Sequence, residues 1–254
     1  AESYPVKYED VSSAPYFPAK ERTAEYREGL FVGYRYFQSA NVPVLFPFGF
    51  GLSYTSFEYS DLTVTDKEAT FTLKNTGSMD GAEVAQLYVS KPDGEVFRPA
   101  RELKGFAKVF LKAGESKKVT IPLDDKAFRY FNVDTNKFEV EGGEYQILIG
   151  ASCADIKLSG AVSVQGTGAK SPYNKEKFAK YFSGDIKSIS DAEFEALLGR
   201  PIPDGHWSGT LEMNDALCQM YYAKSGLARL AYKILTHFLN KSIEKGEPNL
   251  NLMF

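Results

Sequence analysis

The stretch that decides the fold runs from residue 69 to residue 89 and reads ATFTLKNTGSMDGAEVAQLYV. Over residues 69–75, large apolar side chains alternate with threonine and lysine, which is the period of a strand with one buried face. Residues 75–81 contain asparagine, aspartate and two glycines, which tolerate turn geometry, including a positive φ at glycine. Residues 82–89 carry apolar groups on both faces. This pattern predicts a second strand that is covered on both sides and lies centrally in a sheet.

Further short strands surround this pair. Turn signals separate them at residues 91–94, 113–115 and 141–143, and no helical periodicity lies between them. We expect strands at 57–65, 101–111, 117–123, 128–133, 138–140, 144–149 and 156–164. Short strands of this kind, joined by turns, are typical of an antiparallel β-sandwich of the immunoglobulin or fibronectin type.

The segment before the sandwich, residues 1–44, is a lead-in. Three prolines in its first 18 residues exclude a long helix there. Residues 25–37 are dense in aromatics, and we expect an extended segment packed against something large. The alternative is a sugar-stacking surface, for which Tyr34 and Tyr36 are candidate substrate-binding residues.

The segment at residues 45–55 reads LFPFGFGLSYT. Its spaced glycines among aromatics predict a tight bend under close packing. The segment lacks the third glycine and the following helix of a dinucleotide-binding loop, so it does not indicate a phosphate site.

The boundaries of the expected domains follow from the local composition and from the spacing of apolar residues. We expect the sandwich to span residues 45–166, a linker to span 167–187 and a helical C-terminal extension to span 188–254. The linker begins with a run of glycine, serine and proline, whereas apolar residues in the extension recur at helical spacing.

The extension has the signals of three helices. The first begins at a capping box, Ser190 to Glu193, flanked by a hydrophobic staple of Ile189 and Phe194, and it ends at Gly199. We expect Asn214 to cap a second helix that ends at Ala223. An amphipathic third helix is defined by Leu227, Leu230, Ala231, Ile234, Leu235 and Phe238. Basic residues flank its apolar face, and we favour docking on protein over binding to a membrane surface.

Composition excludes several classes of function. The net charge is −3 with both signs interspersed, which argues against a nucleic-acid partner. No apolar run approaches the roughly 20 residues that cross a bilayer, and no signal-peptide pattern is present. The chain begins without Met and stops within an apolar stretch. We therefore expect a piece of a longer protein, in a cytoplasmic location.

Catalytic signals are absent. The acidic residues fall in turns or beside lysine and arginine, where solvated surface charge is the ordinary explanation. Cys153 and Cys218 fall in different predicted domains, which argues against a disulfide, and with the two histidines they have no zinc-ligand spacing. We expect no catalytic residue, no metal and no cofactor. Trp207, in a glycine-rich loop, is a third candidate for sugar stacking, although anchoring of the loop is the commoner role.

Several motifs resemble, in the same order, the C-terminal part of glycoside hydrolase family 3, the β-glucosidase family. They are YREGLFVGYRYF at 26–37, FPFGFGLSYT at 46–55, NTG at 75–77, residues 81–89, Arg98-Pro99 and ELKGF at 102–106. Those from residue 75 onward follow the fibronectin type III-like domain of that family. Ala113 is a departure, since proline is expected before Gly-Glu. The tail from Ser188 resembles an extension of some bacterial members.

This resemblance implies that the chain comes from a retaining, exo-acting β-glycosidase. In that family the nucleophilic aspartate lies in an N-terminal barrel and the acid/base glutamate in an α/β domain, and neither maps onto this chain. We therefore expect an accessory part, inactive alone, that packs on and stabilises the upstream catalytic domains. The alternatives are a carbohydrate-binding module and an oligomerisation element that uses the helix around Leu230 and Ile234.

Overall fold

A computed structural model describes residues 2–17, 23–213 and 215–246. The chain forms two compact units. The first comprises residues 1–17 and 25–202, and the second comprises residues 18–24 and 203–254.

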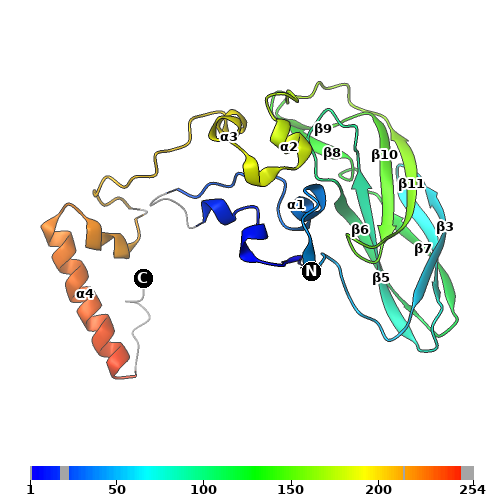
Figure 1. Cartoon of the computed structure of the whole chain (residues 1–254), viewed down its shortest axis with the longest axis horizontal. Coiled ribbons are helices and arrows are strands. Elements are labelled where there is room, and N and C mark those ends of the chain that lie inside the picture. Colours follow the sequence, from blue (N-terminus) through cyan, green and yellow to red (C-terminus); the bar gives the residue numbers. More distant parts are fainter. Residues whose placement is uncertain (1, 18–22, 214, 247–254) are drawn as a thin grey trace. The chain divides into compact units, whose positions relative to one another are not determined.

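The first unit contains the β-sandwich (Figure 1). One antiparallel sheet has the order β11 (Ile156–Val164), β10 (Gly143–Gly150), β5 (Gly81–Ser90) and β6 (Glu102–Leu111). The other has the order β3 (Phe57–Val64), β4 (Glu68–Asn75) and β7 (Ser116–Pro122). Two antiparallel ribbons accompany them: β8 (Arg129–Asn132) with β9 (Lys137–Val140), and β1 (Tyr4–Pro5) with β2 (Val44–Phe46).

The core of the sandwich follows the alternation in the sequence. The buried residues of β4 are Ala69, Phe71, Leu73 and Asn75, which are the alternate positions predicted to face inward. In β5 the side chains of Leu87 and Tyr88 are both fully buried although they point to opposite faces. β5 lies between β10 and β6. The sandwich and the central position of this strand are therefore confirmed.

The turn between these strands carries the chain from one sheet to the other. Asn75 is fully buried there, and its Nδ2 donates to the carbonyl oxygens of Met79 (2.8 Å) and Leu111 (3.2 Å). Gly77 and Gly81 do not take positive φ. Gly77 is needed for space instead, because a Cβ there would lie 2.2 Å from Oγ1 of Thr55.

The lead-in is not extended throughout, because residues Tyr34–Ser39 form a short helix, α1. Short 3-10 turns precede it at Tyr8–Asp10 and Ala14–Tyr16. α1 contributes side chains to two separate clusters. Tyr34 packs with Tyr88 and Cys153, whereas Tyr36 and Phe37 enter a second core. A helical turn reaches both clusters, and this tertiary packing overrides the local pattern that predicted an extended segment.

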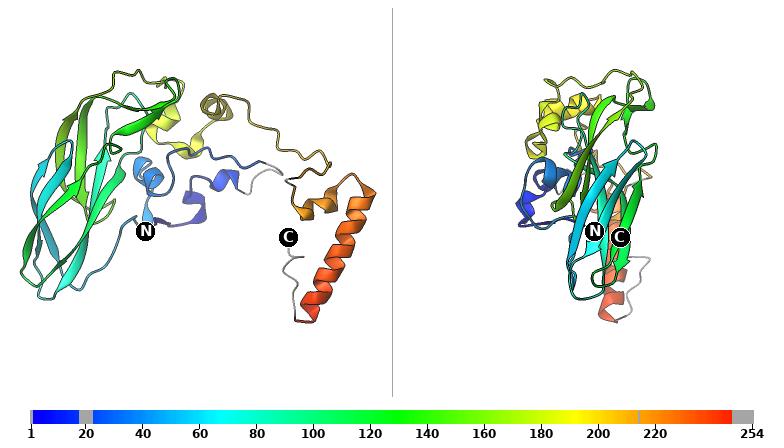
Figure 2. Two further views of the ribbon diagram at one scale, coloured as in Figure 1. Left: turned by 180° about the vertical axis from the view of Figure 1, so that it is seen from behind. Right: turned by 90° about the vertical axis from the view of Figure 1, so that its right-hand side faces the viewer.

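The second core joins the lead-in to residues that follow the sandwich. Phe97, from the connection between β5 and β6, lies at its centre and is 5% exposed. Its ring contacts those of Phe31, Tyr173, Phe178, Tyr181 and Phe182. Figure 2 shows the N-terminal segment (blue) and α2 (Ala179–Ser183, yellow) beside the sandwich. The predicted linker over 167–187 is therefore wrong for its second half, which is packed in a core.

The predicted helix after Ser190 is α3 (Asp191–Leu198), which follows a 3-10 turn at Ile186–Ser188. The Ser190 hydroxyl accepts from the backbone N–H of Glu193 at 3.2 Å, and Gly199 ends the helix with φ of 72°. The Glu193 carboxylate does not return to Ser190, because it accepts from the backbone N–H of Lys180 at 2.8 Å. Ile189 and Phe194 are both buried in the second core, so α3 belongs to the first unit.

The second unit contains a 3-10 helix at Leu217–Tyr222 and α4 at Gly226–Glu244. The second predicted helix is thus a short 3-10 segment, and its expected cap, Asn214, lies outside the described residues. Ser225 caps α4 by accepting from the backbone N–H of Ala228 at 3.3 Å. Within the described ranges, no helix is long and apolar enough to cross a membrane.

We predict that Phe97→Ala lowers the free energy of unfolding by about 3–5 kcal/mol, because a buried aromatic ring leaves a cavity among rings that cannot fully close around it. Urea unfolding followed by circular dichroism measures the change. The control is Tyr54→Ala, whose side chain is 93% exposed and whose loss should change stability by about 0.5 kcal/mol or less. Equal effects of the two variants would contradict the central role of Phe97.

Candidate functional site

Two of the three predicted sugar-stacking residues lie in the interior. Tyr34 is 8% exposed and Tyr36 is 2% exposed. The Tyr34 ring stacks on Phe48 with centroids 4.6 Å apart, and its hydroxyl accepts from the backbone N–H of Leu103 at 2.8 Å. Burial raises the pKa of both phenols. Burial of their rings favours the expected packing role over the alternative of a stacking surface.

Trp207 belongs to the second unit and is partly exposed. Its indole N–H donates to Oδ2 of Asp215 at 3.1 Å, and the same oxygen accepts from the backbone N–H of Glu212 at 2.9 Å. The indole therefore holds its own loop to Asp215, which is an anchoring contact.

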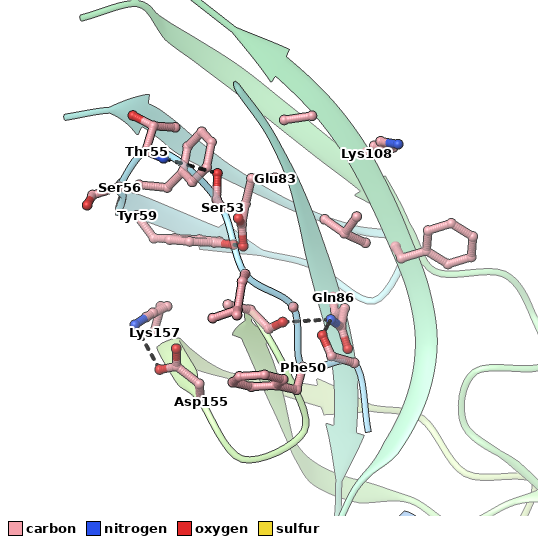
Figure 3. A pocket seen from close by; sticks show the side chains of 18 of the residues that line it. Phe50, Ser53, Thr55, Ser56, Tyr59, Glu83, Gln86, Lys108, Asp155 and Lys157 are labelled. Carbon is pink, nitrogen blue, oxygen red and sulfur yellow. Dashed lines mark hydrogen bonds and ion pairs between the residues drawn. The ribbon is translucent and has the colours of Figure 1, made fainter. Parts of the chain in front are cut away.

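A groove lies elsewhere in the first unit, along the segment that leads into the sandwich (Figure 3). Its volume is about 850 Å³. It is lined by residues of the segment 48–57 and of β3, β5, β6 and β11. The side chains that matter for its chemistry are Phe50, Tyr59, Glu83, Lys108, Asp155 and Lys157.

Gln86 holds this segment against the sheet. Its buried side chain donates through Nε2 to the carbonyl oxygens of Gly49 (3.2 Å) and Ala151 (2.8 Å). Its Oε1 accepts from the Tyr88 hydroxyl at 2.5 Å. Gly49 has φ of 81°, and a Cβ there would lie 2.1 Å from Oε1 of Gln86. The tight, closely packed bend predicted from the spaced glycines is therefore confirmed at Gly49.

A carboxylate lies half-buried in the groove. Glu83 lies on the same face of β5 as Ala85 and Leu87, which point into the core, because every second side chain of a strand points to the same side. The Tyr59 hydroxyl donates to Oε1 of Glu83 at 2.8 Å, and the Tyr59 ring stacks on Phe71 with centroids 5.8 Å apart. Burial raises the pKa of Glu83, although the Tyr59 hydrogen bond and the nearby Lys157 act in the opposite direction. Burial and the adjacent Glu83 carboxylate also raise the pKa of Tyr59.

An ion pair lies beside this carboxylate. Nζ of Lys157 is 2.8 Å from Oδ1 of Asp155, and both side chains are partly exposed. Figure 3 places Tyr59, Glu83, Asp155 and Lys157 on one side of the passing segment and Lys108 on the other. These residues come from β3, β5, the turn after β10, β11 and β6, so their proximity is not visible in the sequence. One sequence feature could have pointed to this site: Glu83 is a charged residue at a strand position whose side chain points inward.

Both cysteines of the chain lie within the described ranges. Cys153 is buried, Cys218 is exposed and both are free. Among the residues that the structure describes, no group of three or more His, Cys, Asp or Glu side chains could hold a metal ion.

A second exposed surface is the β1–β2 ribbon. Tyr4, Val6, Leu45 and Phe46 are each at least half exposed, and we call these four residues the ribbon face. The Tyr4 and Phe46 rings contact each other edge to face, with centroids 6.2 Å apart. Phe46 in turn contacts Phe50 at 5.4 Å, so the ribbon face adjoins the groove.

The sandwich defines this chain as one that contains a fibronectin type III-like domain, and residues 83–153 match the family model of that name. The chain is 48% identical over 175 residues to thermostable β-glucosidase B of Acetivibrio thermocellus, covering 66% of this chain and 23% of the relative. It is 44% identical over 177 residues to exo-α-(1→6)-L-arabinopyranosidase of Bifidobacterium breve, covering 68% and 23%.

A solved structure agrees with these relatives. The GH3 β-glucosidase of Bifidobacterium adolescentis superimposes with a TM-score of 0.63 and 38% identity, over 73% of this chain and 29% of that enzyme. The chain is thus similar to the C-terminal part of glycoside hydrolase family 3 β-glucosidases, as its motifs predicted. It spans 23% of the length of the two curated relatives named above.

The half-buried Glu83 carboxyl predicts a pH-dependent stability. Because its pKa is raised in the folded state, the folded chain binds more protons than the unfolded chain just above pH 4.5, and this residue's contribution to stability falls as the pH rises through that range. Glu83→Gln keeps an acceptor for Tyr59 and removes the charge. We expect the variant to have a higher urea midpoint than the wild type at pH 7, and the difference to shrink below pH 4.5.

The matched control is Glu58→Gln, an exposed glutamate on β3. It should leave the midpoint unchanged at both pH values. A Glu83→Gln midpoint that differs from the wild type equally at both pH values would show that ionisation of Glu83 is not the cause.

Proposed function

We propose that this chain is the accessory C-terminal part of a family 3 β-glucosidase-like enzyme that hydrolyses terminal β-glycosidic bonds. In this proposal the chain packs on the catalytic domains and stabilises them, and it has no hydrolytic activity alone. The observation that carries the proposal is the ribbon face, an exposed apolar surface on a two-stranded ribbon that leads into the sandwich.

The ribbon is poorly supported by its own contacts. An isolated two-stranded ribbon is marginally stable in water and ordinarily requires a further surface to pack against. β1 has two residues and β2 has three, yet the side chains of Tyr4, Leu45 and Phe46 are left half exposed or more. Contiguous apolar surface of this kind marks interaction sites. The relatives supply a partner, since they are glycosidases about four times as long as the matched region.

Part of the lead-in is covered by this chain itself. Phe31, Tyr36 and Phe37 are buried in the second core, so the surface on which these aromatics pack is supplied by this chain. Tyr26, Leu30 and Val32 remain exposed. We therefore confine the proposed docking surface to the ribbon face and the exposed residues between 26 and 32.

The test is a chimera in which this chain replaces the matching C-terminal part of β-glucosidase B of Acetivibrio thermocellus. We expect an active enzyme, because 48% identity over the matched region preserves most contacts. In that chimera Leu45→Asp should lower the midpoint of thermal inactivation by several degrees, because a charge would be buried in the interface. Activity against an aryl β-glucoside after heating measures the loss.

The matched control is Val133→Asp, which places the same charge on an exposed apolar residue in the turn between β8 and β9. It should inactivate at the same temperature as the unmodified chimera. An equal loss of heat resistance in the two variants would overturn docking through the ribbon face.

A second candidate function is self-association through α4. This helix has 19 residues and buries none of them. Leu227, Leu230, Ile234 and Phe238 are exposed at helical spacing on one face. An apolar helical stripe of this length is suited to pairing with the same stripe of a second copy.

We expect the chain to form a concentration-dependent dimer, measured by sedimentation equilibrium. Leu230→Asp with Ile234→Asp should dissociate it, because two charges would enter the apolar seam. Lys233→Asp with His237→Asp, which changes charge on exposed polar positions of the same helix, should leave the dimer intact. A monomer at all concentrations, or a dimer that survives the Leu230 and Ile234 changes, would rule out this interface.

A further inference from the structure

The groove beside residues 48–57 has the size and lining of a ligand site. Its volume of about 850 Å³ lies within the range of small-molecule pockets, which combine apolar walls with a few converging polar groups. Phe50 and Tyr59 supply rings, and Glu83, Asp155 and Lys157 supply hydrogen-bonding groups. None of these residues belongs to the ribbon face or to α4.

The polar groups are held in place before any ligand binds. Tyr59 is fixed by stacking on Phe71, and its hydroxyl fixes Oε1 of Glu83 at 2.8 Å. In the described part of the chain, this hydroxyl is the one hydrogen-bond donor to the Glu83 carboxylate, so Oε2 is free to accept from a ligand. Asp155 fixes Lys157 at 2.8 Å. Such preorganisation lowers the entropy that is lost on binding.

The balance of charge selects the kind of ligand. On the side of Glu83 the lining has the Asp155 and Lys157 ion pair, whereas Lys108 lies on the opposite face of the sheet. An anion gains nothing from this arrangement, because Asp155 and Lys157 neutralise each other and Glu83 repels it. A neutral ligand with hydroxyl groups can donate to Glu83 and accept from Lys157 at the same time. Ring faces beside these groups suit the apolar C–H face of a sugar ring.

We propose that this groove binds a neutral oligosaccharide. Phe50 packs against one sugar ring, Glu83 accepts from ring hydroxyls through Oε2, and Lys157 donates to a hydroxyl of the same or the next sugar. The site is a binding site without catalysis, since one carboxylate is bonded to Tyr59 and the other is paired with Lys157. The inference is independent of docking through the ribbon face.

The test is isothermal titration of the 254-residue chain with cellotetraose and with laminaritetraose. We expect saturable heat with a Kd of about 1 mM or lower for at least one of them. Tetragalacturonate, an anionic oligosaccharide, should bind at least about tenfold more weakly. No heat with either neutral ligand at about 10 mM, or tighter binding of the anion, would overturn the proposal.

Variants locate the site. Phe50→Ala and Lys157→Met should each weaken binding by about tenfold, and Glu83→Gln should weaken it while leaving the fold intact. The matched control is Phe138→Ala, which removes an exposed ring from β9, and Trp207→Ala tests the second unit. Both should bind as the wild type does. Binding that survives Phe50→Ala and Lys157→Met in chains with a wild-type circular dichroism spectrum would overturn this location.

Discussion

The packing of Phe97 among five other rings is the interaction on which the first unit depends. This residue comes from the connection between two neighbouring strands, yet its contacts lie in the lead-in and in residues 173–182. Nearby, the buried Arg27 lies between the rings of Tyr16 (4.4 Å) and Phe194 (5.2 Å). Its charge is paired with Glu25 and Asp191. The segments before and after the sandwich are thereby joined to one another and to the sheet.

This second core decides which surfaces remain available. It buries Tyr36 and Phe37 of α1, whereas Tyr34 is buried against Tyr88 and Cys153, so neither tyrosine is available to a ligand. It leaves the ribbon face uncovered, and Gln86 holds the following segment along the sheet. The groove and the ribbon face adjoin through Phe46 and Phe50, whose centroids are 5.4 Å apart. A partner on one surface and a sugar in the other would therefore be close neighbours.

Prediction from sequence succeeded where a local pattern is sufficient. The alternation over 69–75 and the apolar run over 82–89 fix the faces of β4 and β5, because successive side chains of a strand point to opposite sides. The start of α3 at Ser190 and its end at Gly199 are likewise predictable, because helix caps depend on residues a few positions apart in the chain. The motifs at 46–55 and 102–106 pointed to the family that the relatives share.

The sequence by itself thus determined the β-sandwich, the α4 helix and the similarity to the C-terminal part of family 3 β-glucosidases. Only the tertiary structure decided that residues 34–39 form a helix, that residues 173–194 belong to a core, and that Glu83, Tyr59 and Lys157 meet in one groove. The physical reason is the range of the interactions. Strand period and helix caps depend on residues a few positions apart, whereas burial of an aromatic ring depends on partners that the fold brings from distant segments.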